Sequence, residues 1–174
     1  MDKFVKFVDE KLSGPMNTLA NQRHLLAIRN GIIATLPLII VGSFFLVVAF
    51  IPFPETWPLV GLIQENVGNI LLPYRMTMAI MTLYATFGIG MNLAESYELD
   101  GLSGGILAAA AFLLTINPGT IEDVGFAIPM GPLSGGGMFV GIVASIIAVE
   151  IYRFTDRSNL KISMPEQVPP AVAR

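Results

Sequence analysis

The chain has 174 residues, of which 53% are hydrophobic and only 13% are charged, against about 25% charged residues in an ordinary soluble domain. With a mean hydropathy of +0.68, this composition predicts an integral membrane protein surrounded by a lipid bilayer. The formal net charge of −3 argues against nucleic-acid binding, because it supplies no general attraction for phosphates. The sequence has no cysteine, which excludes disulfides, thiolate metal sites and a cysteine nucleophile. It has one histidine, His24, which excludes a multi-histidine metal site.

The first 30 residues are predicted to form a cytoplasmic juxtamembrane segment. Over residues 2–12, a helical projection places the apolar side chains on one arc and most charged side chains opposite. This pattern favours an amphipathic helix in the membrane interface, with a helix packed on a soluble partner domain as the alternative. His24 follows, between Arg23 and the first span. It has two interpretations, a proton-coupling role or a juxtamembrane position at headgroup depth.

Residues 31–52 form the first predicted transmembrane helix. No charged side chain occurs between Arg29 and Glu55. At 1.5 Å rise per residue, roughly 20 apolar residues in a helix cross the ~30 Å hydrocarbon core of a bilayer. A cleaved signal peptide is the alternative, but its apolar region would be shorter, nearer the start and followed by a small-residue cleavage site. The segment is therefore expected to span the membrane.

Three further spans are predicted, near residues 76–94, 101–117 and 133–152. The second contains fewer branched aliphatic residues than the first, which predicts that it is buried among other helices. Between the third and fourth spans, Thr120 to Pro132 is expected to be an irregular loop, because glycine and proline punctuate it.

Ionisable side chains are expected only at the ends of these spans, where Arg75, Glu95 and Glu150 lie. Ionisable residues at mid-membrane depth usually mark ion or proton pathways. Their absence from the predicted spans argues against a self-sufficient proton-coupled pump. No catalytic, metal-binding or cofactor-binding pattern is found, and no cofactor is expected.

The fourth predicted span contains small residues at a stride of four: Gly137, Gly141 and Ser145. Small residues with this spacing let two membrane helices approach closely. They are the candidate site residues of the sequence, as a helix-packing face or a dimer face. The spacing leaves open whether the neighbour lies in the same chain or in a second subunit.

Basic residues gather at the two ends of the chain. Five of the ten Lys and Arg residues precede residue 30, and four lie in the tail over residues 153–174. The positive-inside rule then places both termini in the cytoplasm, which requires an even number of crossings and agrees with four. The predicted fold class is an all-α polytopic membrane bundle of about four transmembrane helices plus the N-terminal amphipathic interfacial helix. The Pro169-Pro170 pair is expected to start a further helix in the tail, as in a truncated product.

Three stretches together resemble enzyme IIC, the membrane component of the bacterial phosphoenolpyruvate-dependent sugar phosphotransferase system, in its lactose/cellobiose/diacetylchitobiose family. They are QRHLLAIRNGIIATLPLIIVGSFFL (22–46), TFGIGMNLAESYELDGLSGGILAAAAFLL (86–114) and EIYRFTDRSNLKISMPEQVPPAVAR (150–174). The resemblance implies a permease for a beta-linked disaccharide such as cellobiose, diacetylchitobiose or lactose. It also implies a location in the bacterial cytoplasmic membrane and cytoplasmic enzymes IIA and IIB as partners.

The resemblance implies that the N-terminal half of such a permease forms a homodimer contact and that the C-terminal half holds the sugar. The present sequence departs from this pattern by ending before the second half, so no sugar-binding residue can be carried over. We therefore expect the dimerising scaffold portion of a permease, which is not an enzyme by itself. A free-standing membrane protein that assists or regulates a full-length permease is the alternative. A third alternative is an independent four-helix drug exporter. Such a protein would be expected to carry a membrane-embedded acidic residue, and the predicted spans have none at mid-membrane depth, which argues against it.

Overall fold

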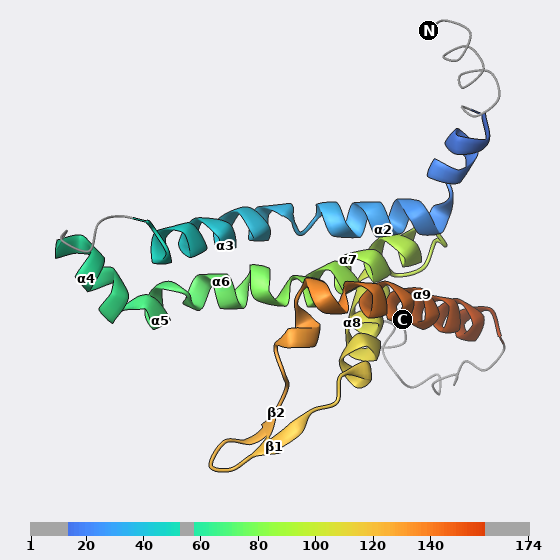
Figure 1. Cartoon of the computed structure of the whole chain (residues 1–174). Helices are drawn as coiled ribbons and strands as arrows, with labels where there is room; N and C mark the ends of the chain where they lie inside the picture. The colour runs from blue at the N-terminus through green and yellow to red at the C-terminus, as the bar shows by residue number, and fades with distance from the viewer. Residues whose placement is uncertain (1–13, 53–57, 159–174) are drawn as a thin grey trace, which may run out of the picture.

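The computed structural model describes residues 14–52 and 58–158. The amphipathic segment predicted over residues 2–12 and the tail from residue 159 onward lie outside the described residues. The described chain is built from helices joined to one short hairpin (Figure 1), as the all-α prediction requires.

The first long helix consists of α2 (Arg23–Ile33) and α3 (Leu36–Ala49), and its length and composition suffice to cross a membrane. It begins eight residues before the predicted span, because nothing between Arg23 and Gly31 breaks a helix. A turn at residues 34–35 precedes Pro37, which has no backbone N–H to donate. The Thr35 hydroxyl donates to the Ile32 carbonyl over 2.7 Å, so the side chain satisfies a backbone acceptor at this turn.

The chain returns beside α3 through a bent helical segment rather than one straight helix. Its pieces are α4 (Pro58–Glu65), α5 (Val67–Ile70), α6 (Leu72–Met76), the 3₁₀ turn η1 (Met78–Ile80) and α7 (Met81–Glu95). The helical stretches on the two sides of Thr77 meet at 42°. The Thr77 hydroxyl donates to the Pro73 carbonyl over 2.6 Å and the Tyr84 hydroxyl to the Met76 carbonyl over 2.9 Å, so side chains satisfy acceptors freed by the break.

This bend changes the position predicted for Arg75. The sequence suggests that Arg75 lies just before the second span, but the structure places it in α6, inside the bent helix pair, with an exposed side chain. Nothing in the sequence indicates this position, because Pro73 lies in the first turn of α6 and the helical segment continues past it.

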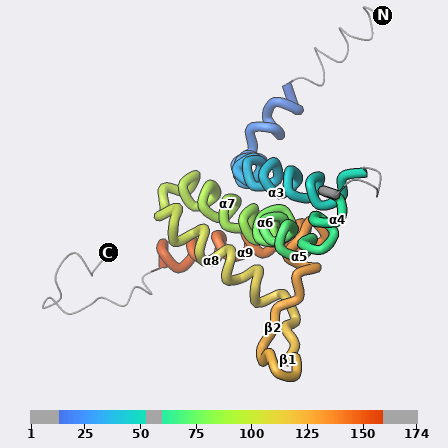
Figure 2. The backbone as a smooth tube through the Cα atoms, turned by 90° about the vertical axis from the view of Figure 1, so that its left-hand side faces the viewer, coloured from blue at the N-terminus to red at the C-terminus, as the bar shows by residue number. Residues whose placement is uncertain are grey.

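The bundle is centred on α7, which lies between the first helix and the pair formed by α8 (Gly101–Thr115) and α9 (Met138–Arg157) (Figures 1 and 2). Eight residues of α7 are buried, and Ala85, Ile89 and Leu93 are fully enclosed. Burial among helices, expected from its composition, is therefore observed. The α8 helix starts at Asp100, whose carboxylate accepts a 2.7 Å hydrogen bond from the Ser103 backbone N–H.

A two-stranded antiparallel hairpin projects from the bundle between α8 and α9 (Figure 1). Its strands are β1 (Gly119–Ile121) and β2 (Gly125–Ala127), with Thr120 opposite Phe126. Asp123 and Gly125 have positive φ angles of 67° and 85°, which turn the chain between the strands. The irregular loop predicted here was wrong over the hairpin, because three-residue strands carry almost no periodic signal. Two 3₁₀ turns, η2 (Gly131–Leu133) and η3 (Gly135–Gly137), then lead into α9.

Glycines set the distance between α7 and its neighbours. A Cβ atom added to Gly90 would collide with the Ala108 side chain and the Gly104 carbonyl of α8. One added to Gly31 of α2 would collide with the backbone of Ile89. Small residues thus allow backbone-to-backbone packing on two sides of α7.

Replacing Gly90 by alanine should therefore destabilise the bundle. We expect Gly90→Ala to cost about 1–3 kcal/mol, the usual cost of overpacking a close-packed site. Thermal unfolding followed by circular dichroism in detergent measures the change. Gly61→Ala in α4 is the matched control, because a Cβ atom there meets nothing within 4 Å. Equal stability of the Gly90 variant and the wild type would contradict this packing.

Candidate functional site

The small-residue stripe predicted from the sequence makes its described contacts within the chain. A Cβ atom on Gly141 would lie 2.8 Å from the side chains of both Thr82 and Thr86, and Ser145 is fully buried. Gly137 lies at the end of η3, directly against the Pro132 carbonyl. The structure thus brings Gly141 and Ser145 together against α7, while Gly137 contacts its own loop. Contact of the stripe with a second subunit stays a prediction.

Hydroxyl groups join α7, α9 and the loop before α9. The Ser145 hydroxyl lies 2.7 Å from the Gly141 carbonyl and 3.2 Å from the Thr86 carbonyl across the interface. Thr82 donates to the Ser134 carbonyl over 2.5 Å. These bonds satisfy buried hydroxyls that would otherwise lack partners in a membrane. They therefore serve the packing of α7 against α9 and the loop before it.

A second group of polar residues, here called the Tyr97 cluster, lies where α2 begins and α9 ends. It contains Arg23 and His24 of α2, Tyr97 of the turn between α7 and α8, and Glu150 and Arg153 of α9. The His24 Nε2 atom is 3.2 Å from Glu150 Oε1, and Arg153 donates to Glu150 Oε2 over 3.3 Å. The Tyr97 hydroxyl donates to the same carboxylate and lies 3.3 Å from His24 Nε2.

Two guanidinium groups lie over the Tyr97 ring. The Cζ atom of Arg23 is 4.6 Å from the ring centroid and that of Arg153 is 4.1 Å from it, so two cation–π contacts link α2 and α9 through one side chain. Burial, together with donation of its hydroxyl to the negative Glu150, raises the pKa of Tyr97 above its ordinary value. The phenol therefore remains a neutral donor at physiological pH.

The cluster is suited to holding three elements together. The carboxylate of Glu150 receives a phenol, a guanidinium and an imidazole from separate parts of the chain, while His24 and Glu150 each remain about one-third exposed. In the described ranges, 14–52 and 58–158, no group of three His, Cys, Asp or Glu side chains is arranged to hold a metal ion. The arrangement thus stabilises one end of the bundle.

Sequence reasoning missed this cluster because its members are far apart in the chain. His24 and Glu150 are 126 positions apart, and Tyr97 occurs in a turn of acidic residues. One pair could have been predicted from spacing alone: Glu150 and Arg153, which are three residues apart on one helix. Both interpretations of His24 left out its carboxylate partner.

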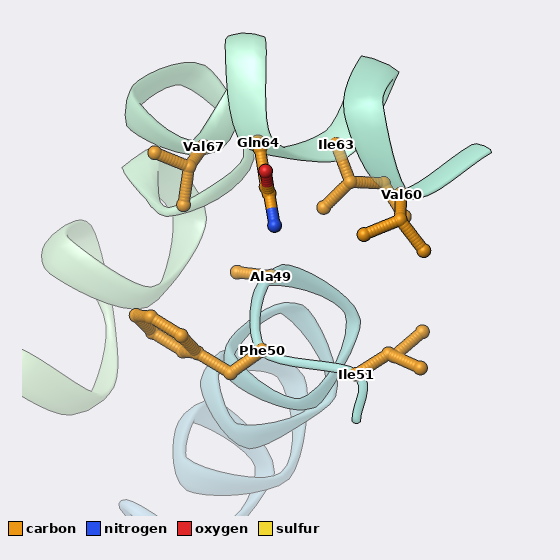
Figure 3. Close-up of a pocket in the computed structure, with 7 residues that line it drawn as sticks. All are labelled: Ala49, Phe50, Ile51, Val60, Ile63, Gln64 and Val67. Carbon is orange, nitrogen blue, oxygen red and sulfur yellow. The ribbon is translucent and has the colours of Figure 1, made fainter. Parts of the chain in front are cut away.

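A cavity of about 400 Å³ lies at the other end of the first helix (Figure 3). It is formed by the end of α3 and by α4 and α5, and its lining is apolar except for Gln64, which points toward Ala49. The apolar lining of the cavity suits contact with apolar groups.

The Tyr97 cluster should behave as a coupled unit. We expect Tyr97→Phe and Glu150→Gln each to lower stability by about 1 kcal/mol, because each removes hydrogen bonds in a partly exposed site. The double variant should cost less than the sum, since the two changes remove one shared bond. Urea or thermal unfolding of the four proteins measures the coupling. Tyr152→Phe is the control, because the Tyr152 hydroxyl has no hydrogen bond within the described chain; strict additivity would contradict the coupling.

The raised pKa of Tyr97 predicts a titration at high pH. A folded-state pKa above the ordinary value of about 10 means that the contribution of the phenol to stability is complete below pH ~10 and is lost as pH rises through the raised value. Absorbance at 295 nm, compared between the wild type and Tyr97→Phe, isolates this residue among the four tyrosines. A midpoint at or below pH ~10 would contradict the burial of the phenol together with its bond to Glu150.

Comparison with known proteins agrees with this architecture. The family model "Phosphotransferase system, EIIC" matches residues 29–174. The cellobiose-specific EIIC component of Geobacillus stearothermophilus is 38% identical over 185 residues, covering 100% of this chain and 41% of the relative. The lichenan permease IIC component of Bacillus subtilis (strain 168) is 37% identical over 188 residues, again covering 100% and 41%.

A solved structure has the same fold. The transporter ChbC, the IIC component from the N,N'-diacetylchitobiose-specific phosphotransferase system, superposes with a TM-score of 0.84 at 35% identity. The match covers 96% of this chain and 41% of that chain. The chain thus spans about two-fifths of the length of the relatives that it matches. From the family match and this likeness together, the chain belongs to the EIIC family of the phosphotransferase system.

Proposed function

We propose that this chain is the N-terminal, dimerising scaffold part of a permease that carries a beta-linked disaccharide in a phosphoenolpyruvate-dependent phosphotransferase system. The observation that carries the proposal is the superposition on the diacetylchitobiose-specific IIC component over 96% of this chain but 41% of that one. Relatives named for cellobiose and lichenan support a substrate with beta-linked sugars. Cytoplasmic enzymes IIA and IIB would supply the phosphate.

The cavity beside α3 agrees with a scaffold role. Recognition of a disaccharide requires many polar partners for its hydroxyl groups, because unpaired polar groups at a binding site cost free energy. This cavity offers one amide, Gln64, among apolar side chains. The close contacts between α7 and α8, by contrast, join helices to one another.

The proposed topology is that of a bacterial cytoplasmic membrane protein with both termini in the cytoplasm. Basic residues at the two ends of the sequence support it. The first helix and α9 are each long and apolar enough to cross a membrane, and the bent pair around Thr77 is a third candidate crossing. The α8 helix is shorter but apolar, and it is the fourth crossing in this proposal.

The proposal predicts that the 174 residues alone do not transport sugar. Cells that lack their own cellobiose permease but contain enzymes IIA and IIB would express this chain, the full-length Geobacillus relative, or both. We expect uptake of labelled cellobiose with the relative and none with this chain alone, because the proposal assigns sugar recognition to the C-terminal half of the permease. Robust uptake by this chain alone would refute the scaffold role.

The control is insertion of the chain into the membrane. Single cysteines introduced near each terminus are the only thiols, because the natural sequence has none. Both should react with a membrane-impermeant reagent from the cytoplasmic side only. Crosslinking in the same vesicles tests the homodimer, whose absence would remove the dimerising part of the proposal. A changed uptake by the full-length relative when both are expressed would instead favour an assembly or regulatory partner.

A further inference from the structure

A polar groove of about 290 Å³ lies between α2 and α7 at the end of the bundle that carries the Tyr97 cluster. Its polar lining consists of Asn21, Arg23, Asn30, Asn92 and Ser96, which come from α2, the turn before it and the end of α7. Leu26 and Ala27 form the apolar remainder. No acidic side chain is among these lining residues.

Several hydrogen-bond donors of the groove lack acceptors. The side chains of Arg23 and Asn30 have no hydrogen bond or ion pair within the described chain, and both are exposed. Asn92 uses one N–H of its amide on the Gly88 carbonyl, over 2.8 Å, which leaves the other N–H uncommitted. Ser96 donates to the Leu93 carbonyl over 2.6 Å and can accept a further bond. The groove therefore offers mainly donors and one full positive charge.

The Tyr97 cluster holds the guanidinium of the groove in place. Arg23 lies over the Tyr97 ring, whose hydroxyl is bonded to Glu150 on the other side. Glu150 is in turn bonded to Arg153 and His24, so the one carboxylate of the cluster already has its own hydrogen-bond partners. A guanidinium placed over a ring keeps its N–H groups for other acceptors, and it loses less side-chain freedom when it binds one.

The position of the groove makes uncommitted donors costly. Arg23 and Asn30 are seven residues apart, or roughly 10 Å along a helix whose length and composition suffice to cross a membrane, and Asn30 directly precedes the predicted span. At the membrane boundary, an exposed amide without a partner is unfavourable, because hydrocarbon supplies no acceptor. The occupant should therefore be polar, anionic and present at the boundary between headgroups and hydrocarbon.

We propose that the α2–α7 groove binds a phosphate group of an anionic ligand, with Arg23 as the charged contact and Asn30 and Asn92 as neutral donors. Guanidinium and phosphate form bidentate, charge-assisted hydrogen bonds, and the amides match the remaining oxygens. A phospholipid headgroup and free phosphate share this chemistry. The inference does not rest on sugar transport, since it concerns only the described residues.

Native mass spectrometry of the purified 174-residue chain tests the proposal. Micelles of a non-ionic detergent would be titrated with phosphatidylglycerol, with zwitterionic phosphatidylcholine or with inorganic phosphate. We expect saturable binding of phosphatidylglycerol at one site and at least tenfold weaker binding of phosphatidylcholine. Competition by inorganic phosphate would show that the phosphate group alone is recognised; lack of competition would assign the site to the lipid headgroup.

Four variants separate the groove from general charge. Arg23→Gln and Asn30→Leu should each weaken phosphatidylglycerol binding about tenfold or more. Arg29→Gln removes an equal charge from an exposed site on the same helix that does not line the groove, and Arg75→Gln removes one from an exposed site on α6, away from the groove. Both should bind like the wild type. Circular dichroism confirms the fold of each variant. Equal weakening by Arg23→Gln and Arg29→Gln, or no saturable binding by the wild type, would overturn the proposal.

Discussion

Close approach of helix backbones to α7 is the constraint on which the rest of the structure depends. Gly31 of α2 and Gly104 of α8 contact α7 at positions where a methyl group has no room, and Gly141 of α9 lies tightly against its threonines. A membrane supplies no hydrophobic drive between helices, so association depends on van der Waals contact and interhelical hydrogen bonds. Small residues on α7 and its neighbours maximise both, which places α7 at the centre.

This packing determines where the polar residues meet. With α2 and α9 fixed against α7, the start of one helix and the end of another come within reach of the turn after α7. Tyr97, which belongs to that turn, can then contact both Arg23 and Arg153. The donor-lined groove beside Arg23 lies between two of these packed helices, α2 and α7.

The two ends of the first helix differ in character. At the Arg23 end, ion pairs, cation–π contacts and uncommitted amides suit a charged membrane surface. At the Ala49 end, the lining of the cavity in Figure 3 is almost wholly apolar. Along α3 between them, Ile40, Phe44 and Val47 are exposed, as expected for side chains that face lipid. The polarity of the surface thus falls along the helix axis from the Arg23 end to the Ala49 end.

The sequence by itself determined the class of the protein, because uncharged apolar runs near 20 residues are stable as helices in lipid whatever they pack against. It also determined that α7 is buried and that Gly141 and Ser145 belong to a packing face. The composition of a helix and the spacing of its small residues indicate which surfaces pack against other helices. Only the tertiary structure decided the bend at Thr77, the hairpin around Asp123 and the meeting of His24, Tyr97 and Glu150. Short strands and bends give weak periodic signals, and contacts between distant residues depend on how the helices pack.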